Sequence, residues 1–244
     1  YRRGGSGMIG IICAMDVELE KILAMMEKEQ GDIISGIVYH RGTIGGKDAV
    51  CVVCGVGKVF AAMCTQTMIL KYSPDCIINV GVAGALDKRL SITDIVVADD
   101  LVQHDMDVTP LGVPRGMILG TDYIAFPTEK KVSDLLYASV DALNKDRTRK
   151  GDKALGICRG RIASGDQFIA AKEQKEDITG AFGAVACEME GAAIAQVCYV
   201  NHIPYAVMRA ISDTADESSE TDFPEFAKEA ADYTAEVIRH FFEA

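Results

Sequence analysis

The sequence predicts a single α/β domain built in three layers, with a central, twisted, largely parallel or mixed β-sheet flanked by helices on both faces. The chain of 244 residues is long enough for one large domain with a substantial core. Short, continuous apolar runs, typical of strands buried on both faces, recur along the chain, and helical patterns separate them. Strands that alternate with helices over the whole length favour one covered sheet.

A buried strand is expected at the start, where residues 8–13 (MIGIIC) form a continuous apolar run. Asp16 can cap a helix that begins near Val17, because acidic residues are favoured at a helix start. The segment GVGK then opens an alanine- and methionine-rich helix at 59–71, which Pro74 ends. The other strands expected in this half are residues 34–41, 49–54, 76–80 and 95–98.

The second half continues this alternation. A charged surface turn is expected at 144–153 (NKDRTRKGDK), and a final helix carries mostly apolar residues at helical spacing. Those residues are Phe223, Phe226, Ala230, Thr234, Val237 and Phe241. The expected strands are residues 154–162, those around Val185, and 204–211, and the other expected helices are 128–143 and 192–200.

The charge of the chain limits its partners. Residues 1–7 (YRRGGSG) are expected to be an expression-tag remnant before one domain at 8–244. The formal charge is −11, and it becomes −13 without the two arginines of 1–7. Nucleic acids and anionic membranes are bound by clustered Lys and Arg, and a membrane span needs about 20 apolar residues in succession. We therefore expect a small-molecule ligand, with no nucleic acid and no membrane as partners.

Eight cysteines raise the question of disulfides or metal. Without a signal-peptide pattern we expect a cytoplasmic location and reduced, buried thiols. Cys51 and Cys54 have CxxC spacing but fall within a strand-like run, where positions three apart point to opposite faces. We expect no metal and no other cofactor. Cysteines in apolar stretches are Cys13, Cys51, Cys54, Cys76, Cys187 and Cys198.

Ligands of such sheets bind where the carboxyl ends of strands lead into loops. Four acidic residues, Glu18, Glu188, Glu190 and Asp213, lie near such ends. Any one of them could be a helix cap, but several acids at one edge repel each other unless they differ in role. A carboxylate pair in distinct environments can supply one general acid and one general base, as in glycosidic bond cleavage.

Other motifs are weaker. GVGK (55–58) lacks the Gly and the Ser or Thr of a phosphate-binding loop, since Val52 and Val59 occupy those positions. Gly81 and Gly84 have only GxxG spacing, which does not establish a dinucleotide site. We interpret His104 as a loop-ordering histidine rather than a metal ligand. Ser164 lacks the GxSxG pattern of a serine nucleophile.

Six motifs resemble, in order and spacing, the bacterial 5′-methylthioadenosine/S-adenosylhomocysteine nucleosidases of the nucleoside phosphorylase/hydrolase family. They are AMDVE, NVGVAGAL, HDMDVT, SGDQFI, EMEGAAIAQVC and RAISDTAD. The resemblance covers residue 8 to the C-terminus, and EMEGAA and RAISD are its most diagnostic parts. It implies a nucleoside phosphorylase-like fold and hydrolysis of the N-glycosidic bond of methylthioadenosine and S-adenosylhomocysteine in methionine salvage, with 5′-deoxyadenosine as a further candidate substrate.

The resemblance also implies residue roles. Asp213 would be the general acid toward adenine N7, Glu18 the general base toward water, and Glu190 would bind the ribose hydroxyls. Asp213 would then need desolvation or a hydrogen bond, whereas Glu18 could act ionised at an ordinary pKa of about 4.3. Phe168 would lie against adenine, the Ile169 backbone at the purine edge, and Met189 against ribose. Met15, Val82, Ala83 and Gly84 would line the pocket, and Arg209 and Ser212 would orient the water and Asp213.

Relatives commonly have Ser where this chain has Val82, and in phosphorylases of this fold that Ser helps to bind phosphate. Val82 and the carboxylate of Glu18 therefore favour water as the nucleophile. The alternatives are a purine nucleoside phosphorylase, a futalosine-type nucleosidase and a non-catalytic nucleoside sensor. The resemblance also implies a homodimer in which a partner supplies apolar residues to the 5′ pocket. The loop 110–120, with Leu111, Val113, Met117 and Ile118, is the segment we expect there.

Overall fold

The computed structural model describes residues 7–121, 123–213 and 219–244, with side chains omitted for 219–225. Its ten strands form one mixed sheet in the order β10-β6-β8-β9-β5-β1-β4-β3-β2, with β7 paired to β6. The strands are β1 (Ile9–Cys13), β2 (Glu27–Ile34), β3 (Ile37–Ile44), β4 (Lys47–Val53), β5 (Cys76–Ala85), β6 (Ile95–Gln103), β7 (Ala125–Pro127), β8 (Ile157–Ser164), β9 (Ala186–Glu188) and β10 (Tyr205–Asp213). The helices are α1 (Asp16–Leu23), α2 (Lys58–Tyr72), α3 (Lys130–Lys150), α4 (Lys172–Phe182), α5 (Gly191–Asn201) and α6 (Ser219–Glu243), with a 3₁₀ turn η1 (Thr109–Leu111).

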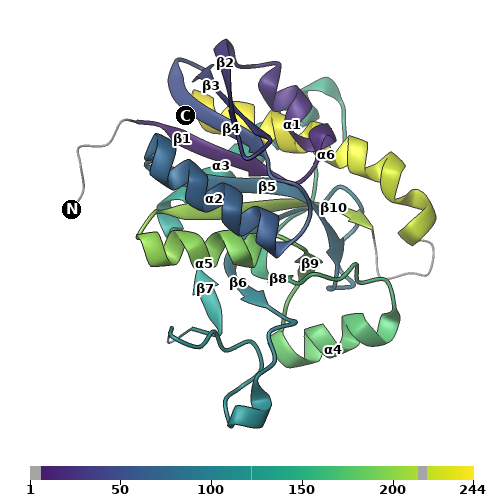
Figure 1. Ribbon diagram of the computed structural model, residues 1–244. Helices are drawn as coiled ribbons and strands as arrows, with labels where there is room; N and C mark the ends of the chain where they lie inside the picture. The colour runs from purple at the N-terminus through teal and green to yellow at the C-terminus, as the bar shows by residue number, and fades with distance from the viewer. Residues whose placement is uncertain (1–6, 122, 214–218) are drawn as a thin grey trace.

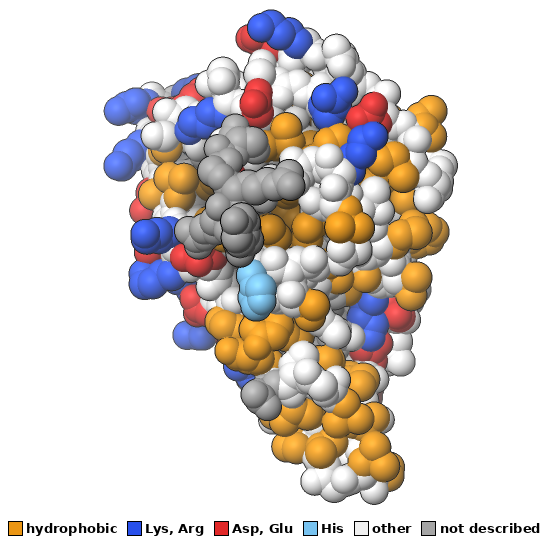
Figure 2. All heavy atoms as spheres, turned by 60° about the vertical axis from the view of Figure 1, so that its left-hand side comes forward, with side chains coloured by type: hydrophobic (Ala, Val, Ile, Leu, Met, Phe, Trp, Pro, Cys, Tyr) orange, Lys and Arg blue, Asp and Glu red, His pale blue; other side chains and the backbone are white. Residues whose placement is uncertain are grey.

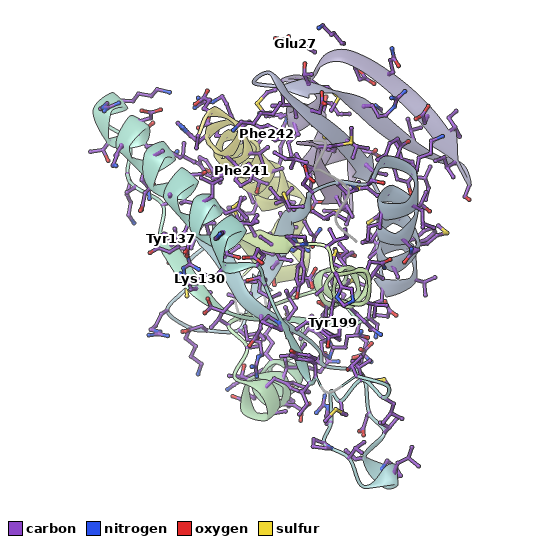
Figure 3. The ribbon with its side chains drawn as sticks, turned by 90° about the vertical axis from the view of Figure 1, so that its left-hand side faces the viewer. Glu27, Lys130, Tyr137, Tyr199, Phe241 and Phe242 are labelled. Carbon is purple, nitrogen blue, oxygen red and sulfur yellow. The ribbon has the colours of Figure 1, made fainter. Side chains whose placement is uncertain are left out.

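Two layers of helices enclose the sheet (Figure 1). On one face, α2 and α5 contribute Cys64, Met68 and Ile194 to a core that includes Val50 and Ile77 of the strands. On the other face, α1, α3 and α6 pack against the opposite side of the same strands, and Figure 3 labels Tyr137 on α3 with Phe241 and Phe242 on α6. These layers confirm the predicted α/β class.

The sheet also closes on itself at one end, which the sequence did not indicate. The first half of β5 pairs with β1, whereas Gly84 and Ala85 at its end pair with Cys187 and Ala186 of β9. Strand β10 pairs in parallel with β5 and antiparallel with β6, and β8 joins β6 to β9. The ends of β5, β9 and β10 are therefore drawn together around one point.

Several expected element boundaries are wrong. Residues 144–150 continue α3 instead of forming a turn, because Asn144 bonds the backbone of Leu155 through both its amide nitrogen and its oxygen, and Gly151 ends the helix with φ +88°. Met15, not Asp16, is the N-cap of α1. Strand β2 was not expected, because it pairs only with β3 and its side chains are mostly exposed.

The apolar positions predicted for the last helix lie inside where they are described. Ala230, Thr234, Val237 and Phe241 of α6 are buried and Phe226 is half-buried, while the side chain of Phe223 lies outside the described residues. All eight cysteines are free thiols, and of the six placed in apolar stretches only Cys76 is not fully buried. Cys51 and Cys54 belong to the cores on opposite faces of the sheet, as expected. Among the described helices, none has the length and apolar character required to span a membrane.

Candidate active site

A cavity of about 220 Å³ opens at the carboxyl ends of β5, β9 and β10, where the starts of α1 and α5 also meet. It brings together nearly every residue that the sequence singled out: Met15, Glu18, Val82, Ala83, Gly84, Phe168, Ile169, Met189, Glu190, Ser212 and Asp213. Arg209 does not line it. Residues that line it without having been assigned a role are Ala14, Val56, Gln167, Cys187 and Glu188.

Glu18 is buried at the start of α1 and held in place by the backbone. Its Oε2 accepts hydrogen bonds from the N–H groups of Ala14 and Met15, both at 2.9 Å, and its Oε1 accepts one from Val82 at 3.1 Å. Burial raises the pKa of Glu18, while the guanidinium of Arg209 and these three donors oppose the rise. The expectation of an ordinary pKa is thus wrong, and the raised pKa makes Glu18 a better proton acceptor.

Glu190 is the N-cap residue of α5, and its side chain turns into the cavity instead of capping the helix. Its Oε1 accepts a hydrogen bond of 2.8 Å from the backbone N–H of Gly57, in the turn before α2. Burial and the nearby Glu188 carboxylate raise the pKa of Glu190 to about 7. An oxygen acceptor in such a setting can bind a hydroxyl group of a ligand.

Asp213 ends β10, with its carboxyl group facing the end of β5. The hydroxyl of Ser212 donates to its Oδ1 at 3.3 Å, and the ammonium group of Lys175 lies 3.7 Å from its Oδ2. Burial raises the pKa of Asp213, and Lys175 and Ser212 oppose this rise. A buried carboxyl group with a raised pKa can carry the proton that a general acid needs.

Behind these groups lies a buried ion pair between Arg209 and Glu188. The Arg209 guanidinium also donates to the side-chain oxygen of Asn79, and Asn79 donates to the carbonyl of Ile12 at 2.9 Å. Burying this network costs less because its hydrogen bonds are satisfied. Arg209 therefore holds the frame of the site together, and the predicted role of orienting water directly is not evident from its position.

Glu188 holds the backbone that presents Glu190. Its Oε2 accepts hydrogen bonds from the N–H groups of Glu190 at 3.0 Å and Gly191 at 2.8 Å, and its Oε1 bonds the Ser164 hydroxyl. The Ser164 hydroxyl in turn accepts from the N–H of Ala192 at 2.7 Å. The first N–H groups of a helix need partners outside it, and Glu188 and Ser164 supply acceptors for three of them at the start of α5, those of Glu190, Gly191 and Ala192.

The mouth of the cavity is apolar and open. Phe168 and Val56 are each 51% exposed, whereas Ile169 is buried. An exposed ring over a cavity can stack on a flat aromatic ligand. Among the described residues, no three His, Cys, Asp or Glu side chains are arranged to hold a metal ion. His104 is buried, with its ring against Gly165.

Comparison with known proteins places this geometry in a family. The phosphorylase superfamily profile matches residues 8–243. The 5′-methylthioadenosine/S-adenosylhomocysteine nucleosidase of Shewanella sp. (strain W3-18-1) is 36% identical over 237 residues, which cover 96% of this chain and 98% of that protein. This chain belongs to the methylthioadenosine/S-adenosylhomocysteine nucleosidase family of the phosphorylase superfamily.

Two solved structures show how far the likeness to this nucleosidase family extends. The nucleosidase of Neisseria meningitidis in complex with methylthio-immucillin-A has a TM-score of 0.88 and 33% identity, covering 96% of this chain and 98% of that one. The futalosine hydrolase of Helicobacter pylori has a TM-score of 0.87 and 33% identity, covering 97% of both chains. The resemblance detected in the motifs is confirmed.

Proposed function

We propose that the protein hydrolyses the N-glycosidic bond of 5′-methylthioadenosine and S-adenosylhomocysteine, releasing adenine and the 5-thioribose product. The observation that carries this proposal is the convergence of three buried carboxyl groups, those of Glu18, Glu190 and Asp213, in one cavity with an exposed ring at its mouth. All three have raised pKa values, and perturbed pKa values are typical of groups at functional sites.

Asp213 is the general acid of this proposal. Its proton passes to N7 of the adenine, so that the base leaves as a neutral molecule, and the Ser212 hydroxyl at 3.3 Å helps to orient the carboxyl group. Phe168 lies against the adenine face, and the backbone of Ile169 lies at the purine edge. A positioned general acid typically contributes about 10²- to 10⁴-fold to a rate.

Glu18 and Glu190 act on the sugar side. Glu18, fixed by three backbone N–H donors, takes a proton from water as the water attacks the anomeric carbon. Glu190 accepts hydrogen bonds from the ribose hydroxyls, and its negative charge stabilises the oxocarbenium-like transition state. Met189 lies next to it in the cavity wall and packs against the ribose.

Water is favoured over phosphate as the nucleophile. The backbone N–H of Val82, which could bind an anion, already donates to Glu18, and the Val82 side chain offers no hydroxyl. The Arg209 guanidinium is likewise engaged by Glu188 and Asn79. Among the described residues that line the cavity there is no Lys or Arg, so a phosphate next to the Glu18 carboxylate would meet a like charge without a cation to offset it.

The test is adenine release from purified protein, measured with and without phosphate, for methylthioadenosine, S-adenosylhomocysteine and 5′-deoxyadenosine. We expect equal rates in both buffers, with methylthioribose as the sugar product of methylthioadenosine, S-ribosylhomocysteine as that of S-adenosylhomocysteine and 5-deoxyribose as that of 5′-deoxyadenosine. Formation of the sugar 1-phosphate only in phosphate would establish a phosphorylase instead. Stoichiometric binding of methylthioadenosine without turnover would establish a sensor.

A second candidate activity is hydrolysis of a futalosine-type nucleoside, which the likeness to the Helicobacter pylori futalosine hydrolase favours. Because the same acid and base would act, the two activities differ only in the substituent accepted at the 5′ side. Including aminofutalosine among the substrates of the assay separates them through the ratio of kcat/KM values.

We further propose that the protein is a homodimer. Figure 2 shows hydrophobic side chains gathered on one face, including the projecting segment at the bottom. Exposed large apolar side chains on α2, the turn before it, α5 and the segment around η1, here called the apolar face, are Val56, Val59, Phe60, Met63, Leu111, Leu119 and Val200. Monomeric proteins rarely expose large contiguous apolar patches. Val56 belongs both to this face and to the cavity wall, so a partner covering the face would also complete the 5′ side of the cavity.

The projecting segment is anchored for such a contact. Tyr123 packs edge-on against Tyr199 of α5, which Figure 3 labels, at 4.8 Å between ring centroids, and this contact joins the segment to the helix layer. Val59→Asp should shift the mass in analytical ultracentrifugation from dimer to monomer and raise KM, because Val59 is 78% exposed in the middle of the face. Ile33→Asp, equally exposed on β2, is the control. A monomeric parent protein would contradict the proposal.

A further inference from the structure

The buried lysine Lys175 has no role in the proposed reaction as described so far. It lies in the first half of α4, whose inward face consists of Lys175, Ile178 and Phe182. A core position with this spacing is normally apolar, and lysine is almost never fully buried unless it is paired. Lys175 is only 3% exposed. Its place in the core therefore calls for a specific partner.

That partner is Asp213. The ammonium nitrogen lies 3.7 Å from Oδ2, and both side chains are only 4% exposed. The pair joins α4 to β10: Asp213 ends β10 and lines the cavity, whereas Lys175 lines a separate cleft beside β5 and α4. A cation near the start of a helix is also disfavoured by the helix dipole, so α4 gains nothing locally from this lysine.

We propose that Lys175 is a positioning residue that sets the acidity of Asp213, its ammonium group stabilising the carboxylate that remains once the proton has moved to the leaving base. The inference rests on the proposed function, in which Asp213 is the general acid. The balance is simple: the O–H bond of Asp213 breaks, an N–H bond forms at adenine N7, and the negative charge left on Asp213 faces the charge of Lys175.

The other described groups around Asp213 are uncharged near pH 7, which leaves the charge of Lys175 to act on it. The Cys187 thiol on β9 also faces it, but burial raises the pKa of that thiol to about 12, so it stays neutral near pH 7. Ser212 contributes only a neutral hydroxyl, and Gly84 of β5 adds no side chain. Among the described residues, Lys175 is therefore the charged group that faces Asp213, and it opposes the effect of burial on the pKa of Asp213.

The sign of the effect can be measured. Without the ammonium group, the ionised form of Asp213 loses its partner and the carboxyl group holds its proton to higher pH. In Lys175→Met the alkaline limb of the kcat/KM profile should therefore move upward by about 1 to 3 pH units, the usual effect of an opposite charge at this range. The plateau value of kcat should fall by about tenfold or more, because a weaker acid transfers its proton less readily.

Two variants separate charge from structure. Lys175→Arg keeps the positive charge, and the alkaline limb of its kcat/KM profile should lie at the same pH as in the parent protein. Lys172→Met removes a lysine of the same helix that is 71% exposed, and it should change neither the limb nor kcat. A purely structural role for Lys175 would lower activity in Lys175→Met without moving the limb.

A second measurement does not depend on turnover. The infrared C=O stretching band of protonated Asp213, assigned by its loss in Asp213→Asn, is followed against pH in the parent protein and in Lys175→Met. The midpoint pH of this titration should rise in Lys175→Met by the same amount as the pH of the alkaline limb of the kcat/KM profile. An unchanged midpoint overturns the inference. Absence of adenine release by the parent protein overturns the proposed function instead, and the infrared titration then still decides whether Lys175 sets the acidity of Asp213.

Discussion

Gly81 and Glu18 lie so close that a Cβ atom on Gly81 would come within 2.6 Å of the Glu18 Oε1 atom. The same holds, less severely, for Gly84 and Asp213, where the distance would be 3.0 Å to Oδ2. The two glycines of the GxxG segment therefore make room for the two proposed proton-transfer groups. Their spacing, which indicated little in the sequence, has its physical reason here.

Gly81→Ala should reduce kcat/KM by about 100-fold or more, because a displacement of about 1 Å in a catalytic group costs that much. The carboxylate of Glu18 would have to leave its three N–H donors or the strand would have to move. Steady-state adenine release measures the loss. Gly180→Ala, on α4 with open space around it, is the matched control and should be neutral. Equal activity of the two variants would contradict the proposed position of Glu18.

Asp213→Asn should lower kcat by about 10²- to 10⁴-fold while leaving the affinity for methylthioadenosine within a few-fold, because the amide cannot donate a proton but keeps the shape of the side chain. Single-turnover adenine release gives the rate, and isothermal titration with methylthioadenosine gives the affinity. Asp166→Asn, at an exposed aspartate after β8, is the control. Normal turnover in Asp213→Asn would remove this residue from the acid role.

The convergence of Glu18, Glu190 and Asp213 could be predicted from the sequence for a simple reason. Each follows an apolar run, and the carboxyl ends of neighbouring parallel strands meet at one edge. The different roles of the two glutamates in EMEG could not be predicted. Glu188 supports the backbone and Glu190 faces the cavity because of the way β9 pairs with both β5 and β8. The pairing of β9 with β5 joins segments about a hundred residues apart and leaves no local pattern.

Two elements were hidden for physical reasons. The inward face of α4 carries Lys175 where an apolar residue would reveal the helical period, so the pairing of that lysine with Asp213 concealed the helix. Strand β2 lies at the sheet edge, where neither face is covered, and its sequence EKEQGDII consequently shows no alternation. In α4 a tertiary ion pair interrupts the apolar period of the helix, and in β2 the exposure of both faces removes the alternation of apolar and polar residues.

The stability of the protein should decrease as the pH rises from about 4.5 to 7. Burial and the Glu188 charge raise the pKa of Glu190 to about 7 in the folded protein, so the folded state holds a proton that the unfolded chain has already lost. The contribution is complete below the unfolded pKa and is lost as the pH passes the folded value. Burial acts in the same direction on Glu18 and Asp213.

Glu190→Gln should accordingly raise the free energy of unfolding at pH 8 by roughly 2 to 3 kcal/mol while leaving it nearly unchanged at pH 4, since one pKa unit corresponds to about 1.4 kcal/mol. Urea titration at the two pH values measures this. Glu20→Gln, at an exposed position of α1, should show no such difference. If Glu190→Gln were equally destabilising at both values, a raised pKa of Glu190 would be excluded.

The buried pair of Arg209 and Glu188 leads to the largest expected change in stability. Removing one partner leaves a buried charge without compensation, and Arg209→Met should therefore lower the free energy of unfolding by about 3 to 5 kcal/mol. Arg239→Met breaks an exposed pair with Glu243 and should cost at most about 1 kcal/mol. Adding Glu188→Gln to Arg209→Met should restore part of the loss, because it removes the stranded charge. Urea titration of the three variants decides the matter, and a loss in Arg209→Met as small as that in Arg239→Met would show that the pair does not hold the site together.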